Sequence, residues 1–384
     1  MKILFYLTRF PGFGGIESVT DLIGNKLCDD GYEISILTHL TQSRLFNLDG
    51  KCNIYIMPDK KEWCSRANVN YAFNLLKSDQ FDAIIYQDSY APTYKIVCRL
   101  AKQFCIPLYV FEHSTPLYQR ISRKASISSN FIKKWLRSMI SYPLEDMKMK
   151  RRRKLLLKNC TKYILLSDAY IPEMNIVLGA TNYAGYDKML SIPNPIIIQD
   201  EASPIKEKLI LFVGRLEPVK RVDLMLDIWS MIEKKYPDWH FAIVGDGSEL
   251  NKLKERAAYL GLKHVSFEGY SDPKPFYRRA SIFWMTSLYE GWPMSLIEAM
   301  QNYCVPIAMD SYSSVRDIIE DKKTGLIALN GDLYQFMTLT LELIEDECML
   351  NDLARSAQES IHKFDISIVI DKWKALLNSR DNKE

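Results

Sequence analysis

The chain has 384 residues, of which 47% are hydrophobic and 25% charged, and it carries a net charge of +3. This composition is typical of a folded globular protein and excludes a disordered chain, a collagen-like repeat and a disulfide-rich scaffold. The length favours two domains over one, and the apolar runs are shorter than the roughly 18–20 residues that a membrane-spanning helix requires.

Short apolar runs alternate with helical patterns in the first half of the chain. The run 2–7 precedes a glycine-rich loop, and it is too short for a signal peptide, so we expect the first strand there. A helix is predicted over 17–31, which has apolar residues at helical spacing. Further strands are predicted at 32–39, 81–87, 107–113 and 161–167. This alternation predicts a parallel sheet covered by helices.

A domain boundary is predicted near 195–206, because two prolines flank Asn194 and a polar stretch follows. The boundary separates a first domain, 1–195, from a second, 196–364. The strand-helix alternation then restarts, with strands predicted at 207–215, 239–247, 264–270, 280–287 and 304–310. Residues 365–384 form a C-terminal helix that packs on the second domain or crosses back to the first.

The eight cysteines and five histidines show no metal-binding pattern. No two cysteines have the CxxC spacing of a zinc or redox site, and several lie in apolar runs. We expect reduced, buried cysteines in a cytoplasmic protein.

Two glycine-rich stretches follow predicted strands, where ligands of open parallel sheets bind. The loop 10–17 contains Gly12, Gly14 and Gly15, which let backbone N–H groups approach a ligand. The turn 244–249 has Gly245 and Gly247 on either side of an aspartate. A tight turn without ligand explains the loop 10–17 equally well, and turns such as 244–249 are too common to indicate a ligand site by themselves.

Charged residues follow two strands of the second half. Arg215 and Lys220 flank the predicted start of a helix after Gly214, which suits a diphosphate, although solvated surface cations remain the alternative. Glu290 is predicted in a loop, and Glu298 in the second turn of a helix that begins at Pro293. A carboxylate accepts hydrogen bonds from two neighbouring hydroxyls. The pair could therefore hold the two sugars of a nucleotide-sugar, although Glu298 could also merely complement the helix dipole.

The segments GRLEPVKRVDLML, VGDGSE, FEGY and SLYEGWPMSLIEAM, in this order, resemble the donor domain of a GT-B glycosyltransferase of the retaining family 4 type. The GGIE loop is similar to the acceptor-side glycine loop of that family. The resemblance covers nearly the whole chain and implies an α/β fold of two doubly wound, Rossmann-like parallel-sheet domains facing a cleft. The first domain would bind the acceptor and the second the nucleotide-sugar donor.

The resemblance also implies roles for individual residues. Arg215 and Lys220 would hold the diphosphate, Glu298 the ribose and Glu290 the transferred sugar, and His113 would lie near that sugar unless it is simply a strand-end histidine. The implied catalytic residues are His113, Arg215, Lys220 and Glu290. The implied donor-binding residues are Gly14, Gly15, Gly214, Arg215, Lys220, Gly245, Asp246, Gly269, Tyr270, Glu290, Gly291, Trp292, Pro293, Met294, Ser295, Leu296 and Glu298. The family usually needs no metal or cofactor. The stretches 301–304 and 310–314 depart from its pattern, which bears on the identity of the donor.

Positive charge is concentrated in the segment 120–158, which has thirteen Lys and Arg residues against two acids. Its apolar residues at helical spacing are Phe131, Ile132, Trp135, Leu136, Met139 and Ile140. A basic amphipathic helix suits an anionic membrane surface, here the inner face of the cell membrane, although a core-packed helix with a solvated face is the alternative. We expect no nucleic-acid partner, because the rest of the chain is acidic and carries no RNA-binding motif.

Together these features predict a hexosyltransferase. It would move a hexose from a nucleotide-sugar, expected to be UDP-linked, to a surface-glycan or lipid-linked saccharide acceptor, with the retention that the resemblance implies. The alternatives are a nucleotide-sugar epimerase of the same architecture and a non-catalytic nucleotide-sugar-binding protein.

Overall fold

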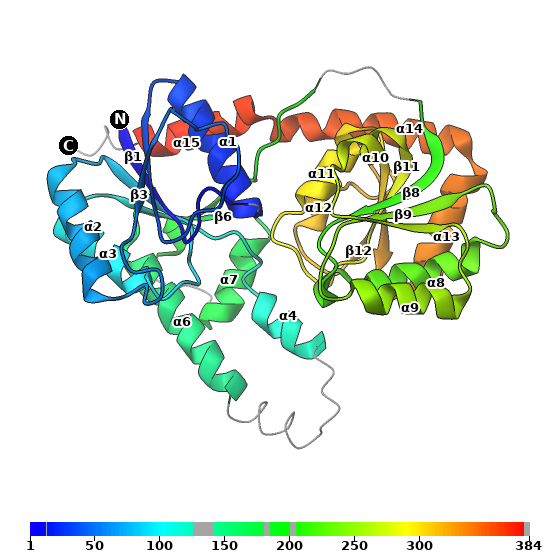
Figure 1. Cartoon of the computed structure of the whole chain (residues 1–384), viewed down its shortest axis with the longest axis horizontal. Coiled ribbons are helices and arrows are strands. Elements are labelled where there is room, and N and C mark those ends of the chain that lie inside the picture. Colours follow the sequence, from blue (N-terminus) through cyan, green and yellow to red (C-terminus); the bar gives the residue numbers. More distant parts are fainter. Residues whose placement is uncertain (13, 126–140, 180–184, 200–204, 380–384) are drawn as a thin grey trace. The chain divides into compact units, whose positions relative to one another are not determined.

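The computed structural model describes residues 1–12, 14–125, 141–179, 185–199 and 205–379 (Figure 1). The chain divides into two compact units. Unit 1 comprises the described residues of Met1–Leu117, Ser126–Pro195 and Ile366–Glu384. Unit 2 comprises those of Tyr118–Ala125 and Ile196–Asp365.

Unit 1 contains a parallel sheet with the strand order β3-β2-β1-β4-β5-β6-β7. Five of its strands occur where the sequence predicts them, whereas β3 and β7, at the two edges, were not predicted. The strands are β1 (Lys2–Tyr6), β2 (Glu33–Thr38), β3 (Asn53–Ile56), β4 (Ala83–Tyr86), β5 (Leu108–Phe111), β6 (Lys162–Leu165) and β7 (Met189–Ser191). Its helices are α1 (Gly15–Asp29), α2 (Arg66–Ser78), α3 (Tyr94–Gln103), α6 (Tyr142–Asn159), α7 (Tyr170–Leu178) and α15 (Ile366–Asn378).

Unit 2 contains a second parallel sheet with the order β10-β9-β8-β11-β12-β13. Only its edge strand β13 was not predicted. The strands are β8 (Glu207–Val213), β9 (His240–Val244), β10 (Val265–Gly269), β11 (Ala280–Met285), β12 (Val305–Asp310) and β13 (Leu326–Leu329). The helices are α4 (Tyr118–Ala125), α8 (Val222–Ile232), α9 (Leu250–Leu260), α10 (Lys274–Arg279), α11 (Met294–Gln301), α12 (Val315–Ile318), α13 (Leu333–Glu345) and α14 (Glu347–Ser360). The two sheets together have the α/β class that the sequence predicts.

The central strands are covered on both faces. Every residue of β4 and of β11 is buried, which explains why these strands read as continuous apolar runs instead of alternating ones. In unit 2, Trp229 of α8 and Phe241 of β9 pack against Trp284 of β11, with ring centroids 6.4 and 5.1 Å away. These three rings belong to the hydrophobic core of unit 2.

The last helix, α15, packs within unit 1. Its Trp373 is fully buried and lies edge-to-face on Phe111 of β5, with centroids 5.2 Å apart. Lys374 forms an ion pair with Asp30, at the end of α1, over 2.9 Å. The chain thus returns to unit 1 after completing unit 2. No helix in the described ranges is long and apolar enough to cross a membrane.

A buried ion pair joins the end of β5 to α6. Glu112 and Arg153 have side chains that are 0% and 2% exposed, and Arg153 also donates to the carbonyl oxygen of Pro116 over 3.0 Å. The hydroxyls of Tyr90 and Tyr163 donate to the Glu112 carboxylate. Because both side chains are buried, loss of one charge would leave the other without a counter-ion in the core.

We therefore expect Arg153→Met to lower the free energy of unfolding by about 3–5 kcal/mol, because the Glu112 carboxylate stays buried without its counter-ion. Arg151→Met, two positions away on the exposed side of α6, should change it by less than about 0.5 kcal/mol. Urea unfolding followed by circular dichroism measures both. The double variant Arg153→Met/Glu112→Gln should recover part of the loss, and equal stability of Arg153→Met and wild type would contradict this account.

Candidate functional site

Unit 2 has a topological switch point between β8 and β11. From β8 the sheet continues on one side to β9 and on the other to β11, and all these pairs are parallel. Loops that leave the carboxyl ends of two such strands form the usual ligand site of an open α/β sheet. The loops here are 214–221 and 286–293, which carry Arg215, Lys220 and Glu290. The fold thus brings these three residues, which the sequence analysis singled out, to the switch point.

Lys220 and Glu290 form an ion pair across this switch point. Their Nζ and Oε1 atoms are 2.6 Å apart, and their side chains are 16% and 14% exposed. Arg215 is exposed, and its guanidinium makes no hydrogen bond or ion pair with any other described residue. One cation is therefore already neutralised by a carboxylate, whereas the other is open to an anionic ligand.

Arg221 holds the two loops together. It adopts a left-handed conformation, with φ of 50°. Its side chain donates to the carbonyl oxygens of Thr286, over 2.6 Å, and Ser287, over 3.3 Å. A backbone hydrogen bond of 2.7 Å from Leu288 to Val219 completes the contact. The spacing of Lys220 and Glu290 is thus set by neighbouring backbone, and Arg221 is a site residue that the sequence analysis missed.

Glu298 lies in the second turn of α11. Pro293 precedes this helix with ψ of 91°, so the helix begins at Met294, one residue later than predicted. The buried hydroxyl of Tyr277 donates to Oε2 of Glu298 over 2.9 Å. Burial raises the pKa of Glu298, and the Tyr277 hydrogen bond and the charge of Lys274 oppose this rise. Tyr277 therefore orients the carboxylate and keeps one of its oxygens in place.

A half-buried lysine, Lys206, supports the backbone at Tyr277. The ammonium group of Lys206 donates to the carbonyl oxygens of Tyr277, over 3.0 Å, and of Asn302. Burial lowers the pKa of Lys206. Asn302 belongs to the stretch 301–304, where the sequence departs from the family pattern, and here that stretch closes the end of α11.

The turns after β8, β9 and β10 lie against one another. Gly245 has φ of 143°, and a Cβ atom there would lie 1.9 Å from the carbonyl oxygen of Gly214. Its N–H donates to the carbonyl oxygen of Gly269 over 2.8 Å. Only glycine fits at Gly245, so backbone atoms form this part of the site. Asp246 is the next residue in the chain, and Tyr270, which follows Gly269, is exposed.

The first turn of α11 can contribute backbone N–H groups to the site, whereas the large side chains of Trp292 and Leu296 are buried. Trp292 is buried and lies edge-to-face on Phe364 at 5.2 Å, and Leu296 is fully buried. The N–H groups of a first helical turn have no partner within the helix. Any role of Gly291, Met294 and Ser295 in binding donor is therefore expected from backbone N–H groups. The side chains of Trp292 and Leu296 serve the core.

The stretch 310–314 supports the loop after β11. The Ser311 hydroxyl donates to the carbonyl oxygen of Ser287, and the Ser314 hydroxyl donates to that of Gly291 over 3.3 Å. Hydroxyls at this departure from the family pattern therefore hold the loop that carries Glu290.

Unit 1 gathers its predicted residues at its own switch point, between β1 and β4. Gly14 and Gly15 begin α1 after β1, and a Cβ atom on Gly14 would lie 2.1 Å from Oε2 of Glu17. His113 follows β5, and its Nε2 lies 2.8 Å from Oε1 of Gln87, the residue directly after β4. Gln87 was not singled out in the sequence, although it ends a predicted strand with a polar side chain.

The imidazole of His113 is held as a neutral ring. Burial lowers its pKa to about 3. Its centroid lies 4.1 Å from that of Phe111, which covers one side. At neutral pH the ring therefore carries one proton and one lone pair.

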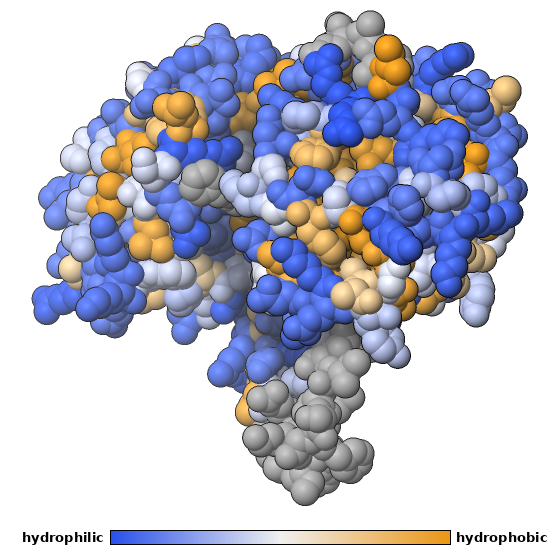
Figure 2. Space-filling view, turned by 45° about the vertical axis from the view of Figure 1, so that its right-hand side comes forward, coloured by the Kyte–Doolittle hydropathy of each residue, from blue (hydrophilic) through white to orange (hydrophobic). Residues whose placement is uncertain are grey.

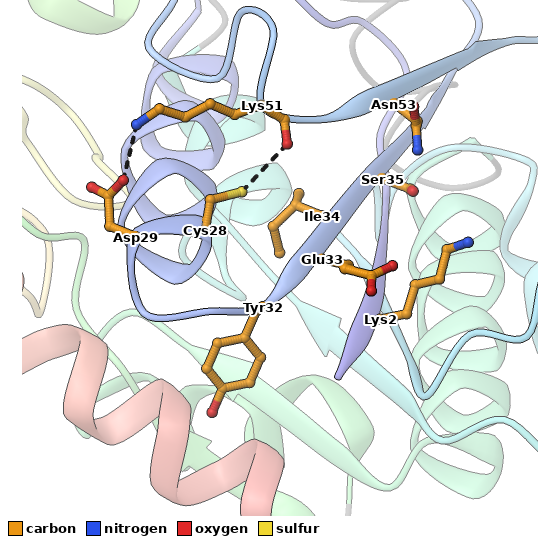
Figure 3. Close-up of a pocket in the computed structure, with 9 residues that line it drawn as sticks. All are labelled: Lys2, Cys28, Asp29, Tyr32, Glu33, Ile34, Ser35, Lys51 and Asn53. Carbon is orange, nitrogen blue, oxygen red and sulfur yellow. Dashed lines mark hydrogen bonds and ion pairs between the residues drawn. The ribbon is translucent and has the colours of Figure 1, made fainter.

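A pocket of about 400 Å³ opens elsewhere in unit 1, where β1, β2 and β3 begin (Figure 3). Its two lysines already have partners, since Lys51 pairs with Asp29 over 2.9 Å and Lys2 with Asp79 over 3.1 Å. The Cys28 thiol, whose pKa burial raises, lies 3.7 Å from the carbonyl oxygen of Lys51. None of the predicted site residues lines this pocket.

The cysteines form no disulfide, and all eight are free. Within the described part of the chain, no group of three or more His, Cys, Asp or Glu residues is placed to hold a metal ion.

Comparison with known proteins gives relatives over nearly the whole length of the chain. Residues 194–360 match the family described as Glycosyl transferases group 1. An uncharacterized glycosyltransferase of Haemophilus influenzae is 25% identical over 98% of this chain and 99% of its own. A Campylobacter jejuni enzyme, GalNAc-alpha-(1->4)-GalNAc-alpha-(1->3)-diNAcBac-PP-undecaprenol alpha-1,4-N-acetyl-D-galactosaminyltransferase, is 26% identical over 98% of both chains.

The fold also matches solved structures. Anabaena HepE in complex with UDP-glucose superposes with a TM-score of 0.77 at 18% identity, covering 99% of this chain and all of that one. The family match covers residues 194–360, which hold the Lys220–Glu290 pair and Glu298, and the likeness to HepE shows that the chain has the GT-B fold.

Proposed function

We propose that the chain transfers a hexose or N-acetylhexosamine from a UDP-linked sugar to a cell-surface glycan or lipid-linked saccharide acceptor, with retention of configuration. The observation that carries the proposal is the meeting of Arg215, Lys220 and Glu290 at the switch point of unit 2, with Glu298 on the helix that follows. HepE, whose structure holds UDP-glucose, supports the choice of donor class. The Campylobacter relative, named for an undecaprenol-linked acceptor, supports the acceptor class.

The Lys220–Glu290 pair provides a site that donor binding can rearrange. A diphosphate brings negative charge to Lys220 and Arg215, so the ammonium shifts from Glu290 towards phosphate oxygens. Glu290 then accepts hydrogen bonds from hydroxyls of the sugar, and Glu298 accepts those of the ribose. The ion pair keeps both charges compensated while the site is empty.

The same groups would act during transfer. The bond between the anomeric carbon and the diphosphate oxygen breaks, and its electron pair leaves with the diphosphate. Lys220 and Arg215 stabilise that developing charge. The acceptor hydroxyl attacks from the same face, and its proton passes to a diphosphate oxygen, so configuration is retained without a protein nucleophile. His113 is proposed to contact the transferred sugar.

Glu298→Ala should weaken donor binding about 10- to 100-fold, because hydrogen bonds to a charged group contribute about 1.5–3 kcal/mol. A thermal-shift screen of UDP-, GDP- and ADP-sugars measures this, since a ligand that binds only the native state raises the melting temperature. We expect a shift with UDP-sugars in wild type and in the control Glu342→Ala, an exposed glutamate of α13. An equal shift in Glu298→Ala would refute the ribose role.

Lys220→Met should weaken binding of UDP about 10- to 100-fold and leave binding of uridine unchanged, because it removes a cation from the proposed diphosphate position only. Titration calorimetry with both ligands gives the ratio directly. Lys254→Met, an exposed lysine of α9, is the matched control. Equal losses for UDP and uridine would show that Lys220 supports the fold of the site and does not bind the diphosphate.

We further propose that the basic segment 120–158 docks on an anionic membrane. Its middle part, 126–140, with Phe131 and Trp135, lies outside the described residues. In α6, one side exposes Leu144 (49%) and Met147 (41%), together with Lys148, Arg151 and Lys158. Hydrophilic residues predominate on the face of the molecule that Figure 2 shows, and apolar residues are scattered among them. Cations beside exposed apolar side chains suit a headgroup layer.

The triple variant Lys148→Ser/Arg151→Ser/Lys158→Ser should bind phosphatidylglycerol vesicles about two orders of magnitude more weakly, since each cation near the surface contributes about 1 kcal/mol. Vesicle co-sedimentation at low salt measures this. The matched control replaces three exposed lysines of unit 2, Lys252, Lys254 and Lys263, with serine and should bind normally. Wild-type protein that ignores these vesicles would rule the docking out.

A further inference from the structure

A chain of buried hydrogen bonds connects the start of α1 with His113. The Thr20 hydroxyl donates to the carbonyl oxygen of Ile16 over 2.7 Å. Thr20 accepts from the Gln87 amide nitrogen over 2.8 Å. Oxygen Oε1 of Gln87 lies 2.8 Å from Nε2 of His113. Thr20 and Gln87 are 0% and 3% exposed, so water does not replace these partners.

The direction of each hydrogen bond follows from proton counting. The Thr20 hydroxyl has one proton and two acceptors within reach, and the proton goes to the nearer one, the Ile16 carbonyl oxygen at 2.7 Å, in preference to Oε1 of Gln87 at 3.1 Å. The Thr20 oxygen is then the acceptor for the Gln87 amide nitrogen, although it also lies 3.1 Å from Oε1. This orientation turns the amide oxygen of Gln87 towards His113, and an oxygen there requires a proton on Nε2.

We propose that Gln87 is a positioning residue that fixes His113 as the Nε2–H tautomer and thereby leaves Nδ1 as a hydrogen-bond acceptor for a substrate hydroxyl. No described residue hydrogen-bonds to Nδ1. The lone proton of the neutral ring is committed to Gln87, so His113 offers a hydroxyl group an acceptor and cannot offer it a donor. This inference rests on the proposed function, because it takes the ligand of His113 to be a sugar hydroxyl.

The geometry places this device beside the glycine loop. Ile16 lies in the first turn of α1, directly after Gly14 and Gly15, and Gln87 directly follows β4 at the switch point of unit 1. The first turn of α1, which begins at the glycine loop, therefore sets the tautomer of His113 through the hydrogen bond of Thr20 to Ile16. Phe111, at 4.1 Å, limits rotation of the ring and keeps Nε2 directed at Gln87.

Three variants test the inference. Gln87→Met keeps the length of the side chain but removes the acceptor. Gln87→Glu keeps an acceptor and adds a negative charge. Gln103→Met, an exposed glutamine at the end of α3, is the matched control. The readouts are the tautomer of His113, from long-range ¹H–¹⁵N spectra of histidine-labelled protein, and kcat/KM against pH with UDP-sugar donors and a saccharide acceptor.

We expect wild-type His113 to be neutral and protonated on Nε2 between pH 5 and 9. Gln87→Met should populate the other tautomer and lower kcat/KM about tenfold, the value of one hydrogen bond. In Gln87→Glu the carboxylate favours the imidazolium and raises the pKa of His113. The imidazolium has no acceptor, so kcat/KM of this variant should fall as the pH decreases through the raised pKa, whereas wild type should show no such fall. Gln103→Met should match wild type.

A wild-type His113 protonated on Nδ1, or Gln87→Met with the wild-type tautomer or unchanged kcat/KM, would overturn the inference. Calorimetric binding of UDP, which in this account depends on Arg215, Lys220 and Glu298 and not on His113, separates this failure from failure of the proposed function. If UDP binds and transfer occurs while the tautomer is wrong, only the role of Gln87 falls. If no UDP-sugar binds or reacts, both the proposed function and the contact of His113 with a sugar hydroxyl are wrong. The spectra still show which tautomer His113 adopts.

Discussion

The parallel direction of the strands is the constraint on which the rest of this structure depends. In each sheet the first strand of the unit, β1 or β8, pairs in parallel on both sides. Carboxyl ends therefore gather at one edge, and the loops beside the first strand carry the functional side chains. The glycine loop and Gln87 follow β1 and β4, and Arg215, Lys220 and Glu290 follow β8 and β11. One rule of topology thus places both groups of residues, each within its own unit.

Burial then determines what each charged or polar group can do. Lys220 and Glu290 compensate each other at 2.6 Å. Glu298, whose pKa burial raises, is held by Tyr277, and Tyr277 in turn by Lys206. Burial of His113 keeps the ring neutral, so its proton can be assigned to one nitrogen. Supporting residues therefore set the geometry and protonation of the groups proposed to touch substrate, which agrees with the usual dependence of a binding site on its surroundings.

The sequence predicts the parts of this molecule that have strong local signals. Fully buried central strands are continuous apolar runs, and residues directly after them are correctly expected at the carboxyl edge. The strands β3, β7 and β13 were missed because they are edge strands of only three or four residues, and a run as short as LIAL in β13 contains too few residues to show the spacing typical of a strand. Long-range partners were also missed, because nothing near Gln87 or Tyr277 in the sequence shows that they contact His113 or Glu298. The place of α15 follows from the fit of Trp373 to Phe111, whereas its amphipathic pattern shows only that it packs on some surface.

The most direct test of the account is a crystal structure of the chain with a UDP-sugar bound. We predict density for the diphosphate at Arg215 and Lys220, ribose hydroxyls on Glu298, and Glu290 moved from Lys220 to a hydroxyl of the sugar. A UDP-sugar bound away from the β8–β11 switch point, for instance in the pocket beside Lys2 and Lys51, would contradict the account. So would an intact Lys220–Glu290 pair that makes no contact with the bound donor.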